Sequence, residues 1–70
     1  MRDVAIRGDM IRLGQLLKLA DVVDSGGELK LLLAGTEVLV NGEPEARRGR
    51  QLHPGDVVAV AGDELRVVAG

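Results

Sequence analysis

The hydrophobic pattern of this chain changes its period at Gly35, and that change constrains the fold more than any other feature. Before Gly35, apolar residues recur three and four positions apart, as on one face of an amphipathic helix. These residues are Leu13, Leu16, Leu17 and Ala20. After Gly35, Val38 and Val40 recur at every second position, which is the period of a strand. The sequence therefore predicts an α+β fold, with two packed helices against a small, mostly antiparallel sheet.

Capping signals predict where the two helices begin. Asp9 precedes the first leucine-faced segment, and we expect it to cap a helix over about residues 10–20. Ser25 followed by Glu28 is a capping box, in which each side chain accepts a hydrogen bond from the backbone amide of the other residue. The second helix should run to about Ala34, where the following glycine ends it. Its core-facing residues should be Leu29, Leu32 and Leu33.

Two turn signals organise the predicted strands. Asn41-Gly42 is a strong hairpin signal, and Gly62-Asp63 should join the last two strands. Between these hairpins, residues 44–56 contain few apolar positions and are expected to form a long loop or an irregular strand. The predicted strands cover residues 2–7, 37–40, 57–60 and 64–68.

Composition limits how the chain is stabilised and what it can bind. A chain of 70 residues is expected to form one domain, here residues 1–70. It has no Cys and one His, so we expect no disulfide, no metal site and no cofactor. No Phe, Tyr or Trp is present, which removes the usual means of stacking unpaired bases. An RNA ligand would therefore be recognised through its backbone shape and charge.

The sequence also favours a cytoplasmic, non-catalytic protein. No segment approaches the ~18 consecutive apolar residues of a membrane span, and the N-terminus, with Asp3 and Asp9 in its first ten residues, lacks a signal-peptide pattern. There is no thiol, no plausible Ser-His-acid arrangement and no phosphate-binding loop. We expect no membrane partner and no catalysis.

A cluster of arginines stands out against the overall charge. The formal net charge is −2, so bulk attraction to phosphate does not explain the string Arg47-Arg48-Gly49-Arg50. An arginine fork can hold two phosphate oxygens at once and is always charged. Alternatively, the nearby Glu43 and Glu45 could pair with these arginines on an ordinary solvated surface.

The order of motifs resembles the alpha-L RNA-binding motif, also called the S-four domain, over about residues 12–60. The matching motifs are Arg12-Leu13, Leu17, Ser25, Val40-Asn41-Gly42 and Gly55-Asp56. Several strings are similar to those of small stand-alone bacterial members, which lack an attached catalytic domain. These strings are residues 16–18, 25–28, 40–43 and 47–50. The resemblance implies that the helices carry a surface for structured RNA, either ribosomal or transfer RNA.

Ten residues are candidates for RNA contact when the resemblance is combined with residue chemistry. Ser25 is first a helix cap, but the amides of Gly26 and Gly27 leave a positive helix terminus open to phosphate. Lys18 and Lys30 are either ordinary exposed residues or parts of a shared basic surface, and Asn41 is a turn residue or an RNA contact. The full set is Arg12, Lys18, Ser25, Gly26, Gly27, Lys30, Asn41, Arg47, Arg48 and Arg50.

Two other functions fit parts of this sequence. A ubiquitin-like sulfur carrier has a similar size and can contain a hairpin like Val-Asn-Gly-Glu-Pro, but it needs a C-terminal Gly-Gly. This chain ends Val68-Ala69-Gly70, and two helices near its start disagree with the opening hairpin of that fold. A small protein-interaction module remains open on sequence grounds.

Overall fold

A computed structural model describes all residues, 1–70, and contains a five-stranded sheet with the order β1-β7-β6-β3-β4. The central strands pair antiparallel, while β1 pairs with β7 in parallel. This arrangement confirms the predicted mostly antiparallel sheet. The strands are β1 Arg2–Ile6, β3 Val38–Val40, β4 Glu43–Pro44, β6 Val57–Val60 and β7 Asp63–Ala69.

Both predicted hairpins are present, each closed by two residues with left-handed backbone. Asn41 and Gly42 have φ of 51° and 84° and join β3 to β4. Ala61 and Gly62 have φ of 50° and 83° and join β6 to β7. Such turns suit the right-handed twist of paired strands. The second turn lies one residue earlier than predicted, because Asp63 already pairs with Val60.

The first helix, α1, covers Leu13–Leu19 and starts later than predicted. The prediction that Asp9 caps a helix from Met10 is wrong. Ile11–Arg12 instead form a short strand, β2, which pairs antiparallel with β5, Gln51–Leu52. Pairing with a distant segment holds residues 11 and 12 extended, and the amide of Arg12 donates to Gln15 Oε1 at 3.2 Å as the helix begins.

The second helix, α2, covers Gly26–Gly35. The Ser25 hydroxyl accepts a hydrogen bond from the Glu28 amide at 3.2 Å, as predicted. The prediction of the reciprocal hydrogen bond in the capping box is wrong, because the Glu28 carboxylate accepts from the amide of Asp24 and not from that of Ser25. Gly35 is still helical, and the chain becomes extended at Thr36.

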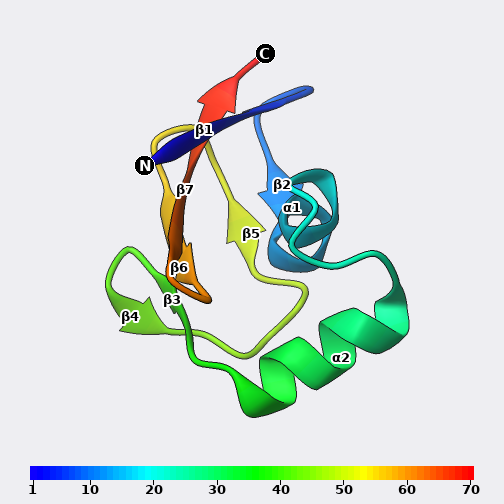
Figure 1. The fold of residues 1–70 in the computed structure, drawn as a ribbon. Coiled ribbons are helices and arrows are strands. Elements are labelled where there is room, and N and C mark those ends of the chain that lie inside the picture. The colour runs from blue at the N-terminus through cyan, green and yellow to red at the C-terminus, as the bar shows by residue number, and fades with distance from the viewer.

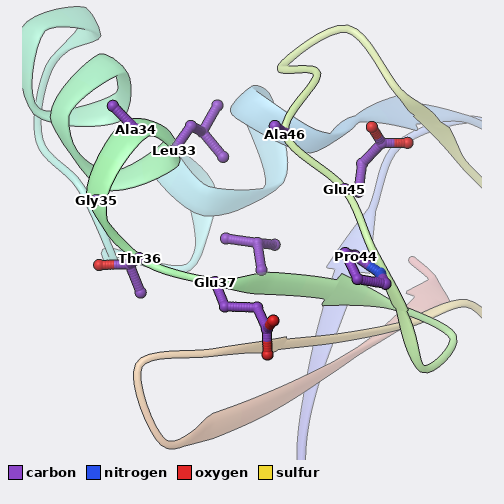
Figure 2. A pocket seen from close by; sticks show the side chains of 9 residues that line it. Leu33, Ala34, Gly35, Thr36, Glu37, Pro44, Glu45 and Ala46 are labelled. Carbon is purple, nitrogen blue, oxygen red and sulfur yellow. The ribbon is translucent and has the colours of Figure 1, made fainter.

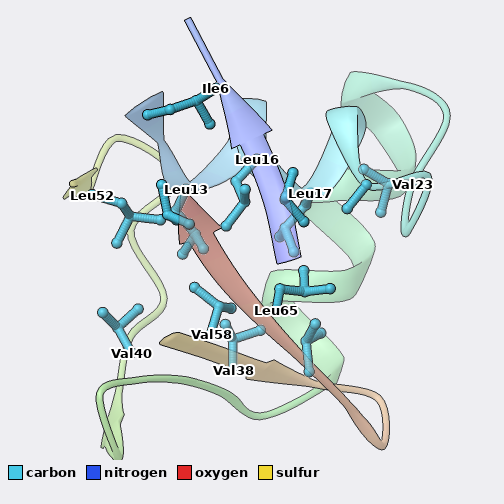
Figure 3. Close-up of a cluster of buried hydrophobic side chains, with 14 of the residues drawn as sticks. Ile6, Leu13, Leu16, Leu17, Val23, Val38, Val40, Leu52, Val58 and Leu65 are labelled. Carbon is cyan, nitrogen blue, oxygen red and sulfur yellow. The ribbon is translucent and has the colours of Figure 1, made fainter. Parts of the chain in front are cut away.

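Both helices pack on one side of the sheet (Figure 1) around a core of 15 buried aliphatic residues. Alternate residues of the strands point into this core, together with Leu13, Leu16 and Leu17 of α1 (Figure 3). From α2, Leu29 is buried, whereas Leu32 and Leu33 are half-buried at the edge of the core. Neither helix has the length and apolar character needed to cross a bilayer.

Candidate nucleic-acid interface

The arginine-rich loop, residues 47–50, is fixed to the start of α1 by backbone hydrogen bonds. The Leu13 amide donates to the Arg50 carbonyl at 2.8 Å, and the Gly14 amide donates to the Arg48 carbonyl at 2.9 Å. The first amides of a helix have no partner within the helix, so the loop satisfies two groups that would otherwise need water. The loop therefore continues the β2–β5 pairing and has a defined position.

Gly14 makes this close approach possible. A Cβ atom at this position would lie 2.8 Å from Leu29 Cδ2 and 3.4 Å from the Arg48 carbonyl oxygen. Because Leu29 is buried, a side chain at residue 14 would push against α2 and the loop at once. The local sequence pattern assigns Gly14 no role, and the glycine inside a helical pattern is the one signal that points to close packing.

Arg12 joins the loop arginines at this place. Its Nη1 donates to the Gly49 carbonyl at 3.2 Å, across 37 positions in sequence. The structure thus brings together four of the candidate residues, which we call the arginine junction: Arg12, Arg47, Arg48 and Arg50. Arg48 is exposed, and its side chain makes no hydrogen bond or ion pair.

Glu45 lies within the junction and binds two of its arginines. Its carboxylate accepts from Arg47 Nε and Nη2, both at 3.1 Å, and from Arg50 Nη1 at 3.0 Å. The side-chain bonds from Arg47, aided by its backbone amide and by Arg50, lower the pKa of Glu45 to about 2. The alternative in which Glu45 pairs with the arginines is therefore confirmed, whereas Glu43 makes no ion pair.

A polar hollow of about 570 Å³ opens beside the junction. No apolar residue lines it, which suits a hydrated anionic ligand better than an apolar one. The lining residues are Arg47, Gly49, Arg50, Gln51 and His53.

The remaining candidates on the helices are exposed and make no hydrogen bond or ion pair with the arginine junction. Lys18 and Lys30 project from α1 and α2 without a hydrogen bond or ion pair. At the start of α2, a Cβ on Gly26 would meet nothing within 4 Å, so the terminus is open. The carboxylate of Glu28 lies at the same terminus and reduces its attraction for phosphate.

The side chain of Asn41 ties the turn between β3 and β4 to the start of β6. Its Nδ2 donates to Asp56 Oδ1 at 3.1 Å, and its Oδ1 accepts from the Val57 amide at 2.9 Å. Burial opposes ionisation of Asp56, but hydrogen bonds from the His53 amide and from Asn41 outweigh it and lower the pKa of Asp56. Both the oxygen and the nitrogen of its side-chain amide are therefore used within the protein, which favours a structural role for Asn41 over RNA contact.

A second hollow, of about 450 Å³, lies between the end of α2, β3 and the segment after β4 (Figure 2). Two acidic residues, Glu37 and Glu45, are among its lining residues, and no basic residue lines it. None of the ten candidate residues lines this hollow, and its charge is unsuited to phosphate.

Comparison with known proteins identifies the family of this chain. A family model described as S4 domain matches residues 4–68. The chain is also 58% identical over 59 residues to the probable ribosome maturation protein RlbA of Bacillus subtilis (strain 168). The aligned stretch covers 84% of this chain and 83% of the relative. Both matches confirm the resemblance found in the motifs between Arg12 and Val60. The chain therefore belongs to the S4 domain family.

Proposed function

We propose that this protein binds structured RNA without catalysing a reaction, and that the arginine junction is its main phosphate-binding surface. One observation carries the proposal: Arg12 of β2 and three arginines of a distant loop are brought together by hydrogen bonds. Only Glu45 offsets their charge within this cluster. Arginine forks carried on a backbone of fixed position suit the phosphates of a folded RNA.

The charge of the whole protein supports local recognition. With a formal net charge of −2, most of the surface does not attract nucleic acid, so binding depends on an RNA that reaches the junction. A flexible strand would offer bases for stacking, but the chain has no aromatic residue to receive them. Folded RNA is therefore the ligand that the chemistry favours.

We propose ribosomal RNA ahead of transfer RNA as the ligand. The relative from Bacillus subtilis is named as a probable ribosome maturation protein, which points to ribosomal RNA or its precursors. Lys18, Lys30 and the open start of α2 would extend contact beyond the junction. The sulfur-carrier alternative is not favoured, because two helices follow β1 where that fold would place a hairpin.

The proposal can be tested by crosslinking the protein to RNA in cells and sequencing the bound fragments. We expect enrichment of double-stranded segments of ribosomal RNA, and a loss of most of that enrichment in the double variant Arg12→Ala/Arg48→Ala. Arg66→Ala is the matched control, because Arg66 lies on the outer face of the sheet and pairs with Asp3. Equal enrichment in both variants, or no enrichment in the unaltered protein, would contradict the proposal.

A further inference from the structure

We propose that Glu45 determines which RNAs the arginine junction accepts, by holding Arg47 and Arg50 in fixed directions. This proposal rests on the RNA binding proposed above. It assigns a positioning role to an acidic residue in a site that otherwise attracts anions.

The carboxylate of Glu45 is almost fully occupied and shielded. One oxygen accepts from the backbone amide and Nε of Arg47, and the other accepts from Nη2 of Arg47 and Nη1 of Arg50. Only 8% of the Glu45 side chain is exposed. Three guanidinium N–H groups converge on this one carboxylate at 3.0–3.1 Å, and together these charge-assisted bonds restrict how both guanidinium groups turn.

The two arginines nevertheless remain able to bind phosphate. A guanidinium carries five N–H donors, and Glu45 uses two of those on Arg47. The Arg47 side chain is 77% exposed and that of Arg50 is 35% exposed. Their unused donors are therefore available only from the side that faces away from Glu45.

A fixed array of donors discriminates between RNAs. Folded RNA presents phosphates at set positions, so it can match the array without an ordering cost in the protein. A single strand would gain more from freely turning arginines that could follow its backbone. The negative charge of Glu45 also repels phosphates that approach the pair from other directions, which adds a repulsive element to specificity.

Glu45→Gln tests the role, because it keeps the size of the side chain and removes the charge. Glu43→Gln is the matched control: Glu43 is exposed, lies two positions away and makes no ion pair. Affinity for a folded ribosomal RNA fragment and for an unstructured strand of equal length is measured over a range of salt. We expect Glu45→Gln to bind the unstructured strand at least about threefold more tightly than the unaltered protein does. The slope of log affinity against log salt should be steeper by about 1.4 if both arginines gain a phosphate contact. Affinity for the folded fragment should change less, and Glu43→Gln should stay close to the unaltered protein.

Two results would overturn the role of Glu45 and leave the proposed RNA binding intact. One is equal affinity of Glu45→Gln and Glu43→Gln for each RNA, and the other is an equal loss of affinity of Glu45→Gln for both RNAs. If the unaltered protein binds neither RNA, the proposed function fails as well. Should Glu45→Gln not fold, NMR of the unaltered protein gives an independent test through the Arg47 Nε–H signal. Its protection from solvent exchange should persist when folded RNA binds, and loss of that protection would show that phosphate displaces Glu45.

Discussion

Replacing Gly14 by Ala should destabilise the protein, although the same change usually favours a helix. In an open helical position, Ala is about 1 kcal/mol better than Gly. At residue 14 the new Cβ would lie 2.8 Å from Leu29 Cδ2, well inside the ~3.5–4.0 Å of carbon contact. Leu29 is buried, so its methyl group can move aside only against other core atoms, and an overpacking cost of about 1–3 kcal/mol applies. We expect a net loss of about 1 kcal/mol in the free energy of unfolding.

Gly35→Ala provides the matched control. Gly35 is also helical, but a Cβ there would meet nothing within 4 Å, so this variant should gain about 0.5 kcal/mol. Urea unfolding followed by circular dichroism gives both values, and thermal unfolding should separate the two variants by several degrees. If Gly14→Ala is as stable as Gly35→Ala, the close approach between α1, α2 and the arginine loop is not a real constraint.

Three further predictions concern stability. Ser25→Ala should cost about 1 kcal/mol in urea unfolding, because the Glu28 amide loses its acceptor, and an unchanged midpoint would argue against the cap. Leu52→Ala should cost about 2–5 kcal/mol, because this fully buried residue fills the core from a segment that is otherwise polar, and a loss below 1 kcal/mol would contradict its packing. The pKa of Glu45 is lowered from 4.5 to about 2, so its stabilising contribution is present above pH 4.5 and disappears as the pH falls towards 2. The stability difference between the unaltered protein and Glu45→Gln should therefore shrink over that range, and a constant difference would refute the ionised pairing.

Local signals predicted the parts of the fold that depend on neighbouring residues. The Asn41-Gly42 hairpin and the Ser25 cap were predicted correctly because both are determined by a few adjacent residues. The start of α1 was wrong because Ile11 and Arg12 are held extended by a partner about 40 positions away. No local pattern reports such pairing, since the signal lies in two segments that meet only after folding.

In the candidate site too, contacts between neighbouring residues could be anticipated from the sequence, whereas contacts between distant segments could not. Sequence identified the arginine string and left open whether Glu45 pairs with it. Only the folded chain shows that Arg12 reaches Gly49, and that Gly14 permits the loop to dock. Whether Lys18, Lys30 and the start of α2 contact RNA stays a prediction, because exposure permits contact without requiring it.

The salt dependence of RNA affinity tests the central account most directly. Each phosphate contact contributes about 0.7 to 0.9 to the slope of log affinity against log salt. Changing Arg47, Arg48 and Arg50 together to Ala should leave the fold intact, because none of them belongs to the aliphatic core. We predict weaker binding to folded ribosomal RNA and a slope flatter by about two to three units. A folded triple variant with unchanged affinity and slope would contradict the proposal that the arginine junction holds phosphate.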